Sequence, residues 1–318
     1  MPFPYLDQLF EKKLLDKKQY TLLSAIYSKK IFSLYYELRT GLYLGVLSFT
    51  TGAGILIYEN AGSLAHLLNN VVLSAIMLAC FWYAGRHRAP FTTAEVESPT
   101  PYYDYVLLLG ALLFLIIEGY LQNIYGVFGQ QWGLAVAVPA ALFFVVAYVF
   151  DHRGVLSLAI VTAAAAVGLQ VSVVAWYKNN VFSEESLIYP AIIFSVCLTA
   201  IAFVLDNLKI KRHFTFSYLL WNSVILLTAL LAALFQFQPK LLFFLILATT
   251  SAGAIYHARK TQTYVFFLMG VTSLYIAVTY MIARLGNIDP VIWYLYFLAS
   301  CIGLVFFVIR SVRTLGNR

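Results

Sequence analysis

Charged residues are scarce in this chain of 318 residues. Asp, Glu, Lys and Arg together make up 11% of it, whereas a soluble domain of this size carries roughly 25%. Hydrophobic residues make up 62%, and the mean hydropathy is +0.81. This imbalance excludes an ordinary soluble domain and predicts that lipid surrounds most of the chain.

The sequence also lacks the patterns of common enzyme and metal sites. It has no HExxH, no Gly-rich phosphate loop, no GxSxG and no His pair at metal-ligand spacing. Cys80, Cys197 and Cys301 lie in apolar runs without a CxxC motif, which is typical of small packing residues. We therefore predict that the protein is not an enzyme and holds no cofactor or metal ion.

Long apolar runs are what the chain has instead. A membrane-spanning helix needs about 20 mostly apolar residues, and ten runs qualify: 41–58, 64–84, 102–122, 132–150, 155–177, 187–206, 214–235, 240–257, 263–284 and 291–309. These runs lack period-2 alternation and most of their connections are short. They predict an all-α polytopic membrane bundle of about ten transmembrane helices with antiparallel neighbours, and they exclude a β-barrel.

Positive charge orients this bundle. Every Lys and Arg except Lys178, Lys240 and Arg284 falls before the first run, after the last, or after an even-numbered run. Cytoplasmic loops retain Lys and Arg, so the bias predicts that both termini are cytoplasmic. The basic sequence pI near 9.2 then reflects contact with anionic membrane lipid headgroups and requires no nucleic acid.

Residues 1–38 differ from the transmembrane domain predicted for 39–318. They are charged and aromatic, which does not fit a cleavable signal peptide. Asp16 and Gln19 resemble a capping box for a second short helix, after a first whose apolar face comprises Leu6, Leu9, Phe10 and Leu14. The segment is interpreted either as an amphipathic element on the membrane surface or as a cytoplasmic contact for a protein partner.

One stretch resembles a known family. Leu121-Gln122-Asn123-Ile124-Tyr125 precedes a Gly-containing loop, and Trp132 then opens an apolar run with Ala and Pro. With the short Lys- and Glu-bearing helical pair before the first run, these features resemble the bacterial predicted membrane proteins of domain-of-unknown-function family 2157, over roughly residues 6–170. The resemblance implies a multi-pass protein of the bacterial inner membrane and implies no activity.

Polar residues inside the runs are the candidate binding site. The third run carries three at i, i+4 and i+7 spacing, Glu118, Gln122 and Tyr125, and the second run offers His66, Asn69 and Asn70 at similar depth. These residues predict an outer-half pocket in which Glu118 binds a substrate or exchanges protons. The alternative is that Glu118 reaches interfacial water and the amides bond neighbouring helices.

Two further polar groups have open interpretations. Asn222 and the segment 249–253, which contains Thr249, Thr250, Ser251 and Gly253, lie near the middle of their runs. They fit either an unwound substrate site or a seam of close helix packing. Asp151-His152-Arg153 forms a turn between two runs and is interpreted as solvated, although a charge relay through it remains open.

Two functions follow from this architecture. Ten spans with short loops resemble the drug/metabolite transporter superfamily in span count, which favours a small-solute carrier. The alternative is a non-transporting scaffold or sensor that contacts a protein partner through residues 1–38. In either case we expect a multi-pass protein of the bacterial inner membrane.

Overall fold

The computed structural model describes residues 9–12, 14–27, 35–59, 64–129, 132–168, 185–284 and 290–316. Every regular element in these ranges is helical, which confirms the predicted all-α class. The α-helices are α2 (Lys17–Tyr27), α3 (Tyr35–Glu59), α4 (Leu64–His87), α5 (Tyr103–Tyr125), α6 (Trp132–Phe150), α7 (Arg153–Gly168), α9 (Glu185–Leu208), α10 (Phe214–Gln236), α11 (Lys240–Thr261), α12 (Tyr264–Ala283) and α13 (Pro290–Gly316).

Each of the ten predicted runs coincides with one helix from α3 to α13. The end of the predicted run 155–177 lies outside the described residues. Eight of the described helices, α4, α5, α6 and α9–α13, are long and apolar enough to cross a membrane, and α7 is apolar but shorter. The polytopic membrane architecture is therefore confirmed.

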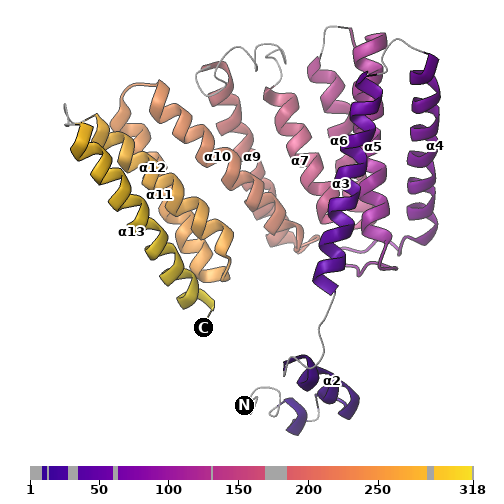
Figure 1. Cartoon of the computed structure of the whole chain (residues 1–318), viewed down its shortest axis with the longest axis horizontal. Helices are drawn as coiled ribbons and strands as arrows, with labels where there is room; N and C mark the ends of the chain where they lie inside the picture. The colour runs from indigo at the N-terminus through magenta and orange to yellow at the C-terminus, as the bar shows by residue number, and fades with distance from the viewer. Residues whose placement is uncertain are drawn as a thin grey trace. The chain divides into compact units, whose positions relative to one another are not determined.

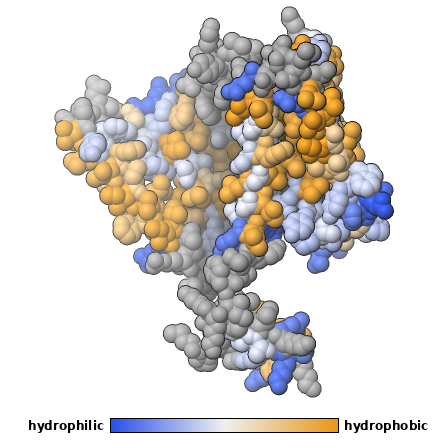
Figure 2. Space-filling model, turned by 45° about the vertical axis from the view of Figure 1, so that its right-hand side comes forward, coloured by the Kyte–Doolittle hydropathy of each residue, from blue (hydrophilic) through white to orange (hydrophobic). Residues whose placement is uncertain are grey.

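Apolar side chains cover much of the helix surface. Many large ones are exposed, for example Trp82, Phe203 and Phe306. In Figure 2 apolar residues, drawn in orange, cover much of the visible flank of the helices. Such extensive exposure is unfavourable in water but favourable in lipid, where apolar side chains meet acyl chains.

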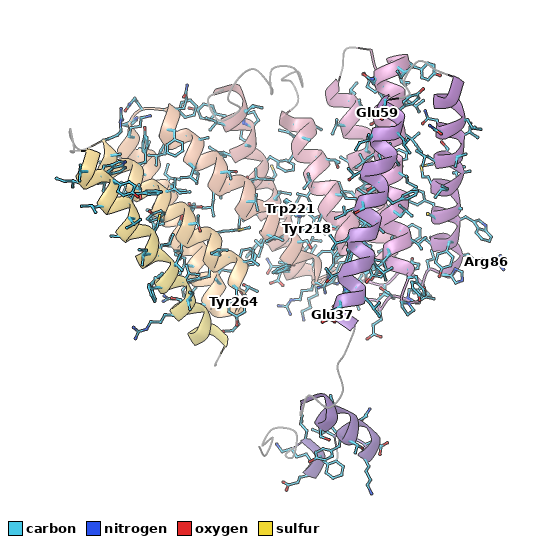
Figure 3. The ribbon with its side chains drawn as sticks, in the orientation of Figure 1. Glu37, Glu59, Arg86, Tyr218, Trp221 and Tyr264 are labelled. Atoms are coloured by element: carbon cyan, nitrogen blue, oxygen red, sulfur yellow. The ribbon has the colours of Figure 1, made fainter. Side chains whose placement is uncertain are left out.

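The chain divides into two compact units, residues 1–59 and residues 60–318. In the first, the Asp16 N–H donates a hydrogen bond of 2.9 Å to Gln19 Oε1, which confirms the predicted capping interaction before α2. Figure 3 labels Glu37 and Glu59 near the two ends of α3. The separate character predicted for residues 1–38 stays a prediction.

The second unit is built from antiparallel helical hairpins. The most extensive contacts join α4 to α5, α6 to α7, α9 to α10 and α11 to α12, and successive helices alternate in direction (Figure 1). We call the end where these four pairs connect the basic end, because Arg86, Arg153, Lys211 and Arg259 lie there. Figure 3 labels Arg86 at this end of α4.

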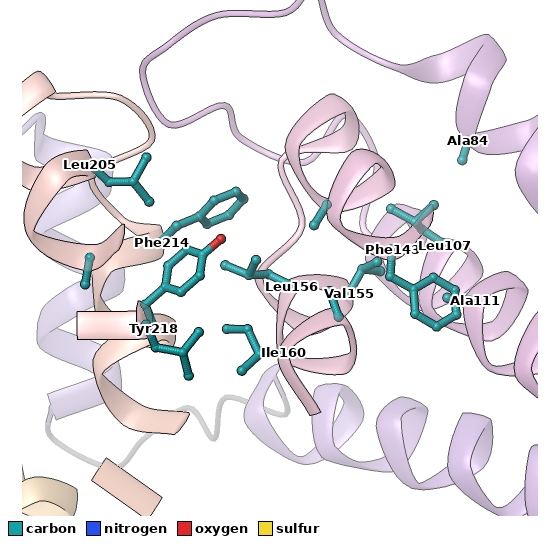
Figure 4. Close-up of a cluster of buried hydrophobic side chains, with 14 of the residues drawn as sticks. Ala84, Leu107, Ala111, Phe143, Val155, Leu156, Ile160, Leu205, Phe214 and Tyr218 are labelled. Atoms are coloured by element: carbon teal, nitrogen blue, oxygen red, sulfur yellow. The ribbon is translucent and has the colours of Figure 1, made fainter. Parts of the chain in front are cut away.

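The largest buried apolar cluster lies toward the basic end. Leu107 of α5, Phe143 of α6, Leu156 of α7 and Phe214 of α10 are all fully buried in it, as Figure 4 shows. These residues come from the beginnings of α5, α7 and α10 and from the later part of α6. The cluster therefore joins α5–α7 to α9 and α10 near one end of the unit.

Candidate functional site

The predicted outer polar residues lie on two neighbouring helices, as expected. A Cβ at Gly110 of α5 would lie 3.1 Å from Cys80 Cβ of α4. Asn70 is ten residues before Cys80 in α4, and Tyr120 is ten residues after Gly110 in the antiparallel α5. The two residues therefore lie level with each other. The Asn70 amide does lie beside the Tyr120 hydroxyl, although neither Asn70 amide atom makes a well-formed hydrogen bond among the described residues.

Glu118 lies on another face of the same helix. Successive residues of an α-helix are about 100° apart, so Glu118 is about 160° around α5 from Tyr120. Asn70 and Glu118 are therefore level with each other but on different sides of α5. Of the remaining second-run candidates, Asn69 is half-buried, and the side chain of His66 lies outside the described residues.

The side chain of Gln122 bonds to the turn that follows α5. Its Nε2 donates a 2.8 Å hydrogen bond to Gly129 O, and its Oε1 accepts one of 2.9 Å from the Phe128 N–H. The side chain is buried, so both ends of the amide are occupied at the turn after α5. Tyr125 is 58% exposed, and its ring packs edge-on against Tyr120, 6.3 Å between centroids.

Glu118 remains the notable candidate of this group. Its Oε1 is buried and has no hydrogen-bond partner among the described residues. Because an α-helix rises 1.5 Å per residue, Glu118 lies about 10 Å from the end of α5 at Tyr125. Glu118 therefore lies about two turns inside the apolar helix. The role of all six residues in substrate binding stays a prediction.

The midplane group of α10 and α11 is part of a packed bundle. α11 is a continuous helix through this group, and the Thr249 and Thr250 hydroxyls donate to carbonyls of their own helix. The unwound-segment interpretation is therefore wrong for α11. Asn222 Oδ1 and Ser251 Oγ are buried without a hydrogen bond among the described residues.

A buried carboxylate at the basic end forms a second polar site. Asp151 Oδ2 lies 3.0 Å from Lys211 Nζ, and Oδ1 lies 2.6 Å from His213 Nε2. The Val96 N–H donates a 2.6 Å hydrogen bond to Oδ2. The Asp151 side chain is 6% exposed and that of Lys211 is 1% exposed. We call these three side chains and the Val96 amide the Asp151 cluster.

The Asp151 cluster fastens the loop 88–102, which connects α4 to α5, to the turn before α10. The Lys211 N–H donates to Thr93 O at 2.7 Å, and Lys211 Nζ lies 3.3 Å from Ala94 O. The ammonium also lies 5.4 Å from the centroid of the Phe91 ring. A recess between the loop and Asp151 has a volume of about 20 Å³, which is room for one water molecule.

His152, the next residue, caps α7. Its Nδ1 accepts a 2.9 Å hydrogen bond from the Val155 N–H in the first turn of α7. A Cβ at Gly154 would lie 2.8 Å from the imidazole Cε1, so glycine leaves room for the ring there. Because Nδ1 is an acceptor, the neutral ring carries its proton on Nε2, which lies 3.9 Å from Asp104 Oδ1.

This geometry favours the neutral imidazole. Burial lowers the pKa of His152, and the nearby carboxylates of Asp104 and Asp151 oppose that shift only in part. A positive charge at a helix N-terminus is also unfavourable, and a proton on Nδ1 would break the cap.

We expect this histidine to make stability depend on pH. Its folded-state pKa lies below the unfolded value of about 6.5. The stabilisation should therefore be complete above about pH 6.5 and be lost as pH falls toward the folded pKa. His152→Asn keeps a capping acceptor without titrating, so the free energy of unfolding should depend less on pH in this range. His87→Asn, at an exposed histidine, is the control; equal pH profiles for all three proteins would contradict the assignment.

The solvated-turn interpretation was thus wrong for two of its three residues. Asp151 and His152 are buried, and only Arg153 is exposed, where its Nη2 pairs with Glu95 Oε1 at 2.5 Å. The Asp151 carboxylate pairs with Lys211 instead of facing water. The sequence placed both residues in basic-side connections, but nothing in the spacing indicated that these connections touch.

The fold and these sites define a polytopic helical membrane protein with polar side chains inside its apolar helices and one charged cluster at the basic end. Among the described residues, no group of three or more His, Cys, Asp or Glu side chains is arranged to hold a metal ion. The Asp151 cluster instead provides paired charges that hold segments together.

Comparison with known proteins finds a family match over part of the chain. The family model described as predicted membrane protein (DUF2157) matches residues 7–156, which confirms the resemblance found in the sequence. That region includes Val96, Asp151 and His152 but ends before Lys211 and His213. No curated protein and no solved structure matches the chain.

Proposed function

We propose that this membrane protein is a small-solute carrier in which Glu118 is the membrane-depth binding group. The observation that carries the proposal is the buried Glu118 Oε1, which has no hydrogen-bond partner among the described residues. An ionisable side chain at membrane depth is unfavourable unless it serves a site or a partner. A proton, or a solute that donates hydrogen bonds, would satisfy this oxygen.

The neighbouring helix offers an acceptor close to this level. Pro139 lies inside α6 and has no N–H, so the carbonyl of Ala135 lacks its usual helical donor. Glu118 is as far from the end of α5 as Pro139 is from the start of α6, and Phe114 and Phe143 join these helices at 5.9 Å between ring centroids. The Ala135 carbonyl lies within about one helical turn of this level, nearer the connection between α5 and α6. A bound solute that reaches both groups could donate to it.

The test is solute-dependent proton movement in proteoliposomes that contain a pH-sensitive dye. A panel of small amines, neutral metabolites and carboxylates is added outside, and wild type is compared with Glu118→Gln and with Glu95→Gln, whose side chain is exposed at the basic end. We expect at least one solute class to drive proton flux in wild type and Glu95→Gln but not in Glu118→Gln. Identical fluxes in all three proteins would contradict the proposal.

A second candidate function has its own observation. The capped helix α2 contacts the preceding helical residues 9–11 through the rings of Phe10 and Tyr20, whose centroids are 4.6 Å apart. A folded element of this kind favours a scaffold or sensor that contacts a protein partner. Crosslinking to one partner that is lost when residues 1–38 are deleted would support it, and crosslinking unchanged by the deletion would oppose it.

The carrier is proposed to lie in the bacterial inner membrane with its basic end and both termini in the cytoplasm. The gathering of Arg and Lys at one end of the hairpins supports this orientation. In this orientation Glu118 faces the outer half of the bilayer and the Asp151 cluster faces the cytoplasm.

A further inference from the structure

We propose that the Asp151 cluster is a releasable latch, which holds the loop 88–102 closed over the basic end of the second unit. Opening of the latch exposes to water the joint between α7 and the helices α9 and α10. The inference concerns this loop and does not depend on Glu118 or on solute transport.

Polar contacts rather than apolar burial hold the loop. Three of them converge on the Asp151–Lys211 pair: Val96 N–H to Asp151 Oδ2, Lys211 N–H to Thr93 O, and Lys211 Nζ to Ala94 O. Most other residues of 88–98 are exposed, including Phe91 at 62%. Segments with few buried apolar contacts open locally at a fraction of the global unfolding free energy.

The ion pair suits a contact that must open. A buried ion pair is rarely more stable than an apolar pair of similar size, because both charges lose their hydration on burial. When the pair is released, water solvates both charges and lowers the free energy of the open state. An apolar pair would gain nothing on exposure. The Asp151–Lys211 pair therefore keeps the closed and open states closer in free energy.

Opening of the loop would affect the recess and the buried apolar cluster beneath it. Asp151 and Lys211 both line the recess of about 20 Å³ under it, together with Tyr103. Val155 and Leu156 of α7, four and five residues after Asp151, pack in the same buried cluster as Leu205 and Phe214. Release of Lys211 would separate the two charged turns at the edge of this cluster and let water enter there.

Amide hydrogen exchange of the full chain in lipid nanodiscs tests the latch. In wild type we expect peptides that contain Val96 to exchange faster than peptides from the buried part of α7, 155–162. Asp151→Asn suits the left-handed backbone at this position, φ 56°, but leaves Lys211 without its counter-charge. It should speed exchange at Val96 by about 100-fold or more. Arg153→Gln, which breaks only an exposed pair, should change it less than about fivefold.

A second variant separates a latch from a fixed structural pair. In Asp151→Asn/Lys211→Met the charges of the pair are gone, the introduced asparagine can still accept from the Val96 N–H, and its amide nitrogen still lies beside the His213 ring. Exchange at Val96 should fall by about tenfold below wild type, toward the rate of α7. Asp151→Asn alone could unfold the whole protein, which loss of protection in α12 would reveal. The comparison of the double variant with wild type would still test the latch in that case. Wild-type exchange at Val96 equal to that of α7, or faster exchange in the double variant, would overturn the proposal.

Discussion

Replacing Lys211 by methionine is expected to lower the free energy of unfolding by about 3–5 kcal/mol. Among the described residues, the Asp151 carboxylate would then remain buried with only His213 and the Val96 N–H as partners. Methionine fills a similar volume, so the loss reports the missing charge rather than a cavity. Unfolding in mixed detergent micelles, followed by tryptophan fluorescence, measures the change.

Arg153→Met is the matched control for this loss. Arg153 also pairs with an acid, Glu95, but 52% of its side chain and 59% of that of Glu95 are exposed. Exposed pairs contribute about 0–1 kcal/mol because water solvates both charges whether or not they meet. Equal losses for the two variants would show that burial of the Asp151 cluster has been misjudged.

Gly270→Ala is expected to destabilise the packing of α11 against α12 by about 1–3 kcal/mol. A Cβ at this position would lie 2.8 Å from Ser251 O and 2.9 Å from Ile255 Cγ1. The first of these atoms belongs to the backbone of α11, so the helices must move apart. The same unfolding measurement detects the loss.

Gly253→Ala provides the comparison on the facing helix. A Cβ there would meet nothing within 4 Å, so the substitution should be neutral or stabilise α11 by up to about 1 kcal/mol through its better helix propensity. Opposite signs at Gly270 and Gly253 would distinguish a packing requirement from a general need for glycine in these helices. The same sign at both would contradict the close approach.

The helices were predictable because their cause is local. Lipid offers no hydrogen-bond partners to the backbone, so an apolar run long enough to span it forms a helix almost regardless of its neighbours. Even the runs with polar interruptions, 64–84 and 240–257, became α4 and α11. The capping interaction of Asp16 with Gln19 was also local, three residues apart.

The candidate site was less predictable. Periodicity placed Glu118 and Gln122 on one face of α5, but it could not show that Gln122 bonds the loop at Phe128 and Gly129. It placed Asn70 at a depth similar to that of the third-run residues, but the side of α5 that α4 contacts is set by helix packing. That packing directs Asn70 to Tyr120.

The sequence by itself determined that this protein is a multi-pass membrane helical bundle with its basic residues gathered at one end, because hydropathy and charge act on each segment separately. Only the tertiary structure decided that Asp151 is buried with Lys211 and His213. These residues lie about 60 positions apart, and their pairing depends on α6, α7, α9 and α10 meeting in one apolar cluster. Contacts of that kind follow from packing between helices, which no local pattern in the chain specifies.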